Sequence, residues 1–206
     1  DALGKTYGVD EMNKGVKLLS HNAKKDDLII LGSSELANAD YIAQNPANIF
    51  PNNHLASSPS LVGRAYVQDL LNGIKIGALG DGFKDKKIIL IVSLQWFLEK
   101  EINKDGFKAH FSELQFYKTM NNEKISENEK KYICTRVLDL ASGESSLAAP
   151  LFYSYLYSRE NVFAKVGLEI LKPYYFLKEK FLDLKDKGHC YHKESPALWC
   201  NECLTS

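Results

Sequence analysis

The chain has 206 residues, of which 45% are hydrophobic and 25% are charged. This composition is typical of a soluble globular protein, and a chain of this length can bury roughly 70% of its unfolded surface. The 26 Lys and Arg residues balance the 26 Asp and Glu residues, which argues against a nucleic-acid-binding protein. No run of about 18 apolar residues occurs, so the sequence predicts no membrane-spanning helix.

Two short apolar runs predict β-strands that are covered on both faces. Residues 28–31 (Leu-Ile-Ile-Leu) are followed by Gly32, and residues 88–92 (Ile-Ile-Leu-Ile-Val) are followed by Ser93. Continuous apolar runs without alternation are typical of parallel sheets. A helix is predicted between them, over residues 60–74. These elements predict the opening part of an open α/β sheet.

Later segments are predicted to be helical. Phe107, Phe111 and Leu114 fall on one face of a predicted helix. Residues 126–129 (Ser-Glu-Asn-Glu) match a capping box, which predicts the start of another helix. The glycine-rich residues 77–82 lack the lysine and hydroxyl of a phosphate-binding loop and are predicted to be a linker before the second strand.

Residues 147–182 are helical by pattern and rich in aromatic side chains, which we expect to pack between helices; contact with a membrane surface is the alternative. Pro173 is expected to stop or kink a helix there. The last twenty residues show little periodicity and are predicted to be coil. The chain is thus divided into the N-terminal part of an α/β domain (1–145), a helical aromatic-rich segment (146–188) and an irregular Cys/His tail (189–206).

A candidate nucleophile follows the first predicted strand. Residues 31–36 (Leu-Gly-Ser-Ser-Glu-Leu) place Ser33 and Ser34 at the carboxyl end of a buried strand, where open α/β sheets bind ligands. Gly32 gives the chain freedom to turn. A serine on such a turn exposes its hydroxyl beside backbone N–H groups that can hold an oxyanion. The alternative is that both serines only cap the next helix.

This motif and several segments that follow it in order resemble the DltD family. The match runs from about residue 15 to about residue 140. The segments after the serine motif are Leu61-Val62-Gly63-Arg64, Lys86-Lys87, Ser93-Leu94-Gln95-Trp96-Phe97, Phe107, Phe111-Ser112, Ile125-Ser126, Tyr132 and Arg136-Val137-Leu138.

DltD proteins are membrane-anchored, extracytoplasmic members of the SGNH hydrolase-like group, and they take part in D-alanylation of teichoic acids in Gram-positive bacteria. The resemblance therefore implies a partial SGNH hydrolase-like open parallel sheet with a large helical portion. It also implies a place at the extracytoplasmic face of the cell membrane, anchored by an N-terminal segment that this chain lacks. It implies no cofactor.

The resemblance also implies roles for individual residues. Ser34 matches the family's nucleophile, the second serine after the glycine. Gly63 falls where SGNH-like proteins use a glycine N–H as an oxyanion donor, and Gln95 and Trp96 fall where such proteins line the site. Leu94 departs from the family, which usually has proline there, but this change removes no reacting group.

A serine nucleophile needs a base to accept its proton, and the base needs an orienting carboxylate. The family takes both from an Asp-x-x-His motif near the C-terminus of a considerably longer chain, and this sequence stops before that region. Asp186 and His189 have the same spacing without the family's surrounding residues. They are the candidate base pair within this chain, with a chance match as the alternative.

The C-terminal cysteines and histidines suggest a second kind of site. Cys190 and His192, followed by Cys200 and Cys203, carry the ligand types that zinc prefers, although seven residues between His192 and Cys200 make a tighter loop than zinc fingers use. A redox pair, a disulfide and a terminus with incidental cysteines are the alternatives. The resemblance to DltD asks for no metal here.

The resulting hypothesis is acyl transfer in the D-alanylation of teichoic acids, with Ser34 holding the D-alanyl group covalently. The expected partners are a teichoic acid polymer or D-alanyl donor and other membrane components of the D-alanylation system, and no nucleic acid. Two alternatives stay open. One is a general SGNH-like esterase acting on a surface polysaccharide, and the other is a non-catalytic module that binds teichoic acid or a membrane partner.

Overall fold

The computed structural model describes residues 14–17, 19–20, 28–36, 59–93, 98 and 103–193, with side chains described up to residue 187. The elements in chain order are β1 (Leu28–Leu31), the 3-10 helix η2 (Ser34–Leu36), β2 (Ser60–Val62), α4 (Asp69–Leu79), the 3-10 helix η3 (Gly80–Phe83), β3 (Lys87–Leu90), α6 (Lys104–His110), α7 (Glu113–Asn121), α8 (Glu127–Leu140), the 3-10 helix η4 (Ser145–Leu147), α9 (Ala148–Ser158) and α10 (Val162–Lys193).

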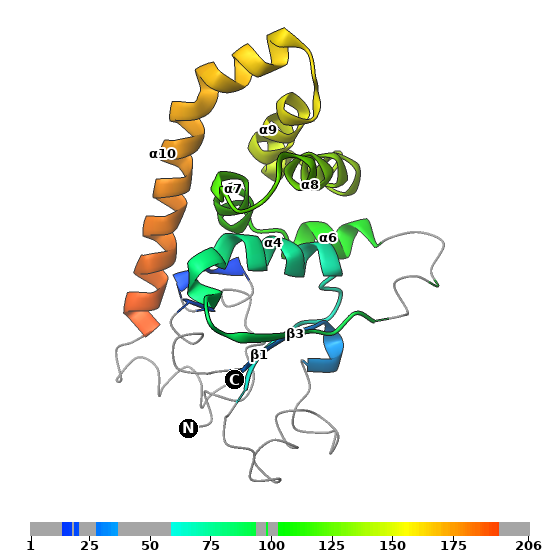
Figure 1. Cartoon of the computed structure of the whole chain (residues 1–206), viewed down its shortest axis with the longest axis vertical. Helices are drawn as coiled ribbons and strands as arrows, with labels where there is room; N and C mark the ends of the chain where they lie inside the picture. The colour runs from blue at the N-terminus through cyan, green and yellow to red at the C-terminus, as the bar shows by residue number, and fades with distance from the viewer. Residues whose placement is uncertain are drawn as a thin grey trace.

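The three strands form a parallel sheet in the order β2-β1-β3. Ile30 of the central strand pairs with Leu61 on one side and with Ile89 on the other. Figure 1 shows α4 and α6 lying over this sheet, with α7, α8 and α9 beyond them and α10 running along the side. The predicted α/β class, with a partial open parallel sheet and a large helical portion, is confirmed.

Residues 60–74 correct the sequence prediction, because they do not form one helix. Ser60–Val62 is a buried strand, and the helix begins only at Asp69. Tyr66 lies between them with φ 67°, a left-handed conformation that cannot belong to an α-helix. Three residues are too few to show a periodicity. Their strand identity comes from backbone pairing with β1, which is a tertiary contact.

The two predicted strands differ in burial. Ile29, Ile30 and Leu31 of β1 are each at most 2% exposed, as expected for a central strand covered on both faces. In β3, by contrast, Ile89 is 45% and Leu90 is 39% exposed. The prediction of two covered faces is therefore wrong for β3, because within the described part of the chain this strand lies at an edge of the sheet.

The glycine-rich residues 77–82 are not the predicted linker. α4 continues to Leu79 and is followed directly by the 3-10 helix Gly80–Phe83. A Cβ on Gly77 would lie 2.7 Å from Cγ2 of Thr119, so this glycine allows α4 and α7 to approach closely. Thr119 also donates its hydroxyl hydrogen bond to the carbonyl of Ile74 at 2.7 Å. The two helices are joined at this point by packing and by a hydrogen bond.

Phe107, Phe111 and Leu114 are all buried, but they do not share one helix. α6 ends at His110, and Ser112 caps the next helix by accepting a hydrogen bond from the N–H of Gln115 at 3.3 Å. The Ser-x-x-Gln pattern at this cap is a helix-start signal inside an otherwise periodic stretch. Local capping therefore divides a segment that periodicity alone would join.

α8 begins as predicted. The side chain of Ser126 accepts from the N–H of Glu129 at 3.3 Å, and the carboxylate of Glu129 accepts from the N–H of Ser126 at 2.9 Å. Both halves of the capping box are therefore formed. Ile133, Val137 and Leu140 follow at helical spacing and are buried in the main core. Capping and periodicity agree here, and the prediction is confirmed.

Three tyrosines from three helices form the centre of the aromatic core. The ring centroids of Tyr153 and Tyr175 lie 4.8 Å apart and edge to face, and both rings contact Tyr117. The expectation that the aromatic segment packs between helices is correct only for part of it. The aromatic side chains that remain exposed are Phe152, Tyr155, Phe163, Tyr174, Phe176 and Phe181.

α10 corrects two further expectations. Pro173 lies inside the helix without stopping it, and the helix continues to Lys193, through residues predicted to be coil. Leu168 and Tyr175, on either side of the proline, both pack against the main core. A proline removes one helical hydrogen bond, whereas burial along the inner face stabilises the helix on both sides of it.

Candidate functional site

The turn after β1 is held by its own backbone and by Glu35. The N–H of Ser33 donates to Oε1 of Glu35 at 2.7 Å, and the N–H of Leu36 donates to the carbonyl of Ser33 at 3.2 Å. The N–H of Gly32 donates to the carbonyl of Val62 at 3.0 Å, which ties the turn to the end of β2. The strand therefore ends in a short 3-10 turn whose position is determined by the neighbouring strand.

The two serines of this turn have different surroundings. Ser33 is 2% exposed, and its hydroxyl donates to the carbonyl of Arg64 at 3.3 Å. Ser34 is exposed at the first position of the 3-10 helix. Ser33 thus joins the β1 and β2 loops, and Ser34 presents its hydroxyl to solvent. The alternative that both serines only cap the following helix does not hold for Ser33, because its hydroxyl donates to the β2 loop instead.

Gly63 lies directly against the serine turn. A Cβ at this position would stand 2.6 Å from the backbone oxygen of Ser33 and 2.8 Å from Cβ of Leu36. Both distances are shorter than any ordinary contact, so only glycine fits without movement of the turn. The structure therefore places Gly63 against the backbone of the turn that carries Ser34.

Two buried polar residues of α4 support the turn from below. Nδ2 of Asn72 donates to the carbonyl of Gly32 at 3.3 Å, and Nζ of Lys75 donates to Oδ1 of Asn72 at 3.5 Å. Asn72 is fully buried and Lys75 is 1% exposed, and this burial lowers the pKa of Lys75 to about 8. Neither residue is among the site residues predicted from the sequence. The available signal was a polar pair that interrupts the apolar face of α4 formed by Leu71 and Ile74.

Further charges lie close to the same loops. Burial and the positive charges of Arg64, Lys14 and Lys75 lower the pKa of His110, while its hydrogen bond with the backbone of Ala65 opposes this shift. His110 is thus a hydrogen-bonded histidine behind the β2 loop. Positive charge gathers on this side of the turn.

The opposite sign of charge occurs at the start of α4. Burial, followed by the negative charge of Glu35, raises the pKa of Asp69. Asp69 and Glu35 are therefore neighbours around the turn, and a proton is held more readily on Asp69 than on an isolated carboxylate.

Of the remaining predicted site residues, only Asp186 has a described side chain, and it does not lie at the turn. Gln95 and Trp96 lie outside the described residues. Oδ2 of Asp186 accepts hydrogen bonds from the backbone N–H groups of Val16 at 3.0 Å and Lys17 at 2.9 Å. Figure 1 shows the C-terminal part of α10 and the turn of Ser34–Leu36 on opposite sides of the sheet.

The side chain of His189 lies outside the described residues, so its pairing with Asp186 stays a prediction. The suggested zinc site likewise stays a prediction. Cys190 and His192 belong to the last turns of α10, where side chains are not described, and Cys200 and Cys203 lie beyond the described residues. Cys134 is buried, and this burial raises the pKa of its thiol to about 12. It is therefore an inert packing residue.

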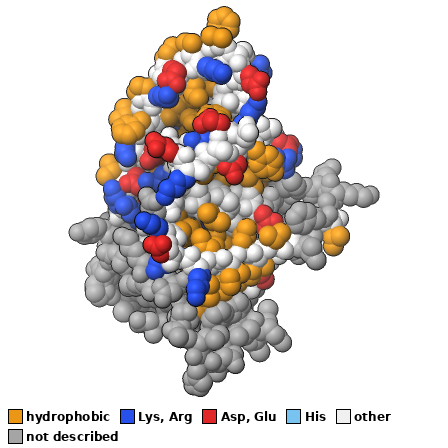
Figure 2. All heavy atoms as spheres, in the orientation of Figure 1, with side chains coloured by type: hydrophobic (Ala, Val, Ile, Leu, Met, Phe, Trp, Pro, Cys, Tyr) orange, Lys and Arg blue, Asp and Glu red, His pale blue; other side chains and the backbone are white. Residues whose placement is uncertain are grey.

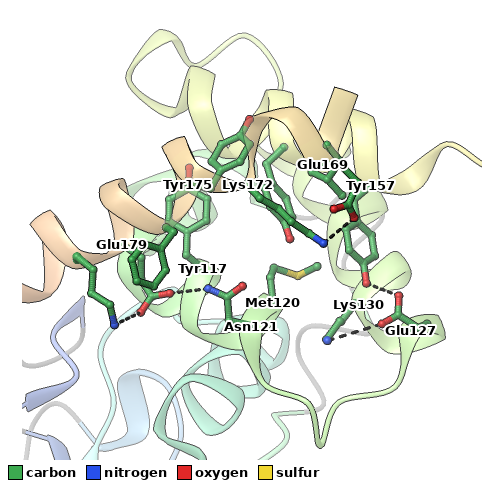
Figure 3. A pocket seen from close by; sticks show the side chains of 14 residues that line it. Tyr117, Met120, Asn121, Glu127, Lys130, Tyr157, Glu169, Lys172, Tyr175 and Glu179 are labelled. Atoms are coloured by element: carbon green, nitrogen blue, oxygen red, sulfur yellow. Dashed lines mark hydrogen bonds and ion pairs between the residues drawn. The ribbon is translucent and has the colours of Figure 1, made fainter. Parts of the chain in front are cut away.

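A second concave region lies between α7, α8, α9 and α10 (Figure 3). Its volume is about 770 Å³, and it is lined by tyrosines together with paired charges. The hydroxyl of Tyr157 donates to Glu127 at 2.5 Å, and Nζ of Lys130 lies 3.8 Å from the same carboxylate. Asn121 donates to Glu179 at 2.5 Å on the far side. The polar groups of this cavity are largely paired with one another, and it is separate from the serine turn.

The chain resembles proteins of one family over most of its length. It is 30% identical to Protein DltD of Bacillus subtilis (strain 168) over 153 residues, which cover 74% of this chain and 38% of that relative. It is 33% identical to Protein DltD of Staphylococcus aureus over 110 residues, covering 53% of this chain and 27% of the relative. For Protein DltD of Lacticaseibacillus rhamnosus the identity is 26% over 132 residues, covering 64% of this chain and 30% of the relative.

The chain thus spans between 27% and 38% of the length of these curated relatives. The model of the family described as DltD protein matches residues 7–198. That match includes the serine turn, Gly63 and the helices that cover the sheet, as the resemblance of the sequence motifs implies. The chain belongs to the DltD family.

Proposed function

We propose that this chain takes part in the D-alanylation of teichoic acids, with Ser34 as the nucleophile that accepts a D-alanyl group. The observation that carries the proposal is the contrast between the two adjacent serines. Ser33 is buried and hydrogen-bonded, whereas Ser34 is exposed at the end of a parallel strand. Membership of the DltD family supports the choice of substrate.

The proposed reaction has two acyl-transfer steps. The Ser34 oxygen bonds to the carbonyl carbon of a D-alanyl ester, the bond to the donor's leaving group breaks, and the hydroxyl proton passes to a base. A hydroxyl of the polymer then attacks the D-alanyl-serine ester, which restores the Ser34 hydroxyl and leaves the D-alanyl group on the polymer. The base is expected to be the histidine of an Asp-x-x-His motif, as in the family.

Gly63 and the turn give this mechanism its electrostatic support. Each step passes through a tetrahedral oxyanion, which backbone N–H groups near Ser34 and Gly63 stabilise. Lys75 places positive charge beneath the same turn through Asn72 and the carbonyl of Gly32. The teichoic acid polymer, the D-alanyl donor and the membrane components of the D-alanylation system are the partners of this reaction. Its place is the extracytoplasmic face of the membrane.

The test is intact-mass measurement after labelling the purified chain with a serine-directed fluorophosphonate. Labelling is run with and without added imidazole, which can accept the proton when no side chain of the chain does so. We expect one adduct on the parent chain and none on Ser34→Ala. Ser33→Ala is the matched control, because it removes the same group one residue earlier, and it should retain the adduct.

Two results contradict the proposal. An adduct that survives in Ser34→Ala shows that another residue is the nucleophile. An adduct that disappears only in Ser33→Ala shows that the buried serine reacts. The acceptor is tested separately with a D-alanyl ester and purified teichoic acid: release of free D-alanine at the same rate with and without polymer would favour the esterase alternative over transfer.

A further inference from the structure

One peptide group next to Ser34 is held at both ends by side chains. This is the group that joins Gly32 to Ser33. Its carbonyl oxygen accepts a hydrogen bond from Nδ2 of Asn72 at 3.3 Å. Its N–H donates to Oε1 of Glu35 at 2.7 Å. Because a peptide group is planar and rigid, two contacts at its opposite ends fix the orientation of the whole plane.

The contact with Glu35 depends on the glycine at position 32. A Cβ on Gly32 would lie 2.5 Å from Oε1 of Glu35 and 2.9 Å from Cδ1 of Leu36. Any larger side chain at this position would therefore push the carboxylate off the turn. Glu35 is half-buried, and its carboxylate folds back over the peptide group that precedes it by two residues. The sequence thus provides both the acceptor and the space that the acceptor needs.

Lys75 determines which end of the Asn72 amide faces the turn. Nζ of Lys75 donates to Oδ1 of Asn72 at 3.5 Å. An ammonium group only donates hydrogen bonds, so it takes the amide oxygen and leaves the amide nitrogen for the carbonyl of Gly32. Asn72 is fully buried and Lys75 is 1% exposed, so both contacts are shielded from bulk water.

Lys75 is a cation in the interior of the protein. Figure 2 shows Lys and Arg side chains on the visible face beside Asp and Glu, where solvent also surrounds them. Burying an ammonium group, in contrast, is costly. Packing alone does not require a charge at this position, because an apolar side chain of the same size would fill the space at a lower cost. The cation beneath the turn therefore favours a role for the contacts that it begins.

These contacts form one polarised chain, which we call the turn relay. It begins at the Lys75 ammonium, passes through the Asn72 amide and the peptide group, and ends at the Glu35 carboxylate. Every donor in the relay points the same way, with a cation at the donating end and an anion at the accepting end. Hydrogen bonds aligned in series polarise and strengthen one another, so a change at one end of the relay is felt at the other.

We infer that the turn relay fixes the backbone that carries Ser34 and so positions its hydroxyl for reaction. The side chains of the relay act through the peptide group, which makes them positioning residues. A nucleophile reacts fast only near its attack geometry, and a displacement of about 1 Å can cost roughly 100-fold in rate. The inference rests on the proposed role of Ser34, and the two measurements below separate one from the other.

The first test is the rate of fluorophosphonate labelling of Ser34 on the whole chain, measured over a range of reagent concentrations. Asn72→Ala should lower the maximal rate roughly 10- to 100-fold and leave the reagent concentration at half-maximal rate unchanged, because orientation and not binding is disturbed. Lys75→Met should lower the maximal rate less, because the Asn72 amide stays in place. Glu35→Gln keeps an acceptor for the Ser33 N–H and should retain most of the rate that Glu35→Ala loses.

Thr119→Val is the matched control. The Thr119 hydroxyl donates to the carbonyl of Ile74 at 2.7 Å, so this change also removes a buried hydrogen bond to α4 but leaves the relay intact. It should lower the melting temperature and label at the parent's rate. An equal loss of rate in Asn72→Ala and Thr119→Val would reduce Asn72 to a general structural role and overturn the inference. Labelling lost as fully in Glu35→Gln as in Glu35→Ala would also overturn it, because Glu35 would then be the proton acceptor. Since Glu35 is half-buried, its variants should fold even where Asn72→Ala does not.

The second test is the NMR resonance of the Ser33 amide proton, which does not depend on labelling. This proton should resonate at low field, because its N–H donates to a carboxylate at 2.7 Å. Asn72→Ala, at the other end of the peptide group, should move the resonance upfield, whereas Thr119→Val should not. An unmoved resonance in Asn72→Ala overturns the relay, whatever the labelling shows. A parent chain that takes no label at Ser34, while the resonance moves as expected, contradicts the proposed function and not the relay.

Discussion

Replacement of Gly63 by alanine tests how closely the β2 loop supports the serine turn. The new methyl group would lie 2.6 Å from the Ser33 carbonyl oxygen and 2.8 Å from Cβ of Leu36. An ordinary carbon–oxygen contact is longer than 2.6 Å by more than half an ångström. The carbonyl oxygen of Ser33 and Cβ of Leu36 are held in place by the backbone, so neither atom can rotate away. Overpacking of this kind costs about 1–3 kcal/mol, so Gly63→Ala should unfold roughly 2–12 °C below the parent chain.

The control for this prediction is Gly73→Ala in α4. Gly73 is exposed, and a Cβ there would meet nothing within 4 Å. Alanine in an open helical position should stabilise the protein by about 0.5–1 kcal/mol, so the two glycine-to-alanine changes should have opposite signs. Urea unfolding followed by circular dichroism measures both. Gly63→Ala should also slow fluorophosphonate labelling of Ser34, whereas Gly73→Ala should not. Unchanged stability in Gly63→Ala would falsify the close packing of the turn.

Three further changes test the charges and caps of the fold. Lys75 has a folded pKa of about 8 against an ordinary 10.5, so between these pH values the unfolded chain binds more protons than the folded one. The free energy of unfolding should therefore rise with pH over this range, by about 3 kcal/mol in all. Lys75→Met should flatten this rise, which urea unfolding at pH 7.5 and 9.5 measures. Ser126→Ala removes the capping box of α8 and should destabilise the protein by about 1 kcal/mol in the same assay, with no effect on labelling. Burial raises the pKa of Asp183, but hydrogen bonds from Lys187 and Lys118 outweigh this effect and leave a pKa of about 2. The stability of the fold should therefore fall as the pH drops from 4 towards 2. In Asp183→Asn, melting curves should show a smaller loss of stability over this pH range.

Elements whose signals are local could be predicted from the sequence. The apolar run of residues 28–31 is a buried strand, and the capping box at Ser126 starts a helix, because strand burial and end capping are both encoded within a few neighbouring residues. The order of the motifs around the two serines likewise indicated the DltD family. These predictions required no knowledge of what packs against what.

Features that depend on a partner distant in the sequence could not be predicted from local patterns. Ser60–Val62 is a strand only because β1 offers it a parallel neighbour, and Ser33 differs from Ser34 only because the carbonyl of Arg64 lies within reach of one hydroxyl. Lys75 is buried because α4 places it beneath the turn. Of the aromatic residues of α10, Tyr175 is in the core whereas Phe163, Tyr174, Phe176 and Phe181 are exposed, according to which face of the helix meets α7 and α9. Periodicity can identify an apolar helix face, but only the packing of the whole chain determines which of two apolar faces is covered.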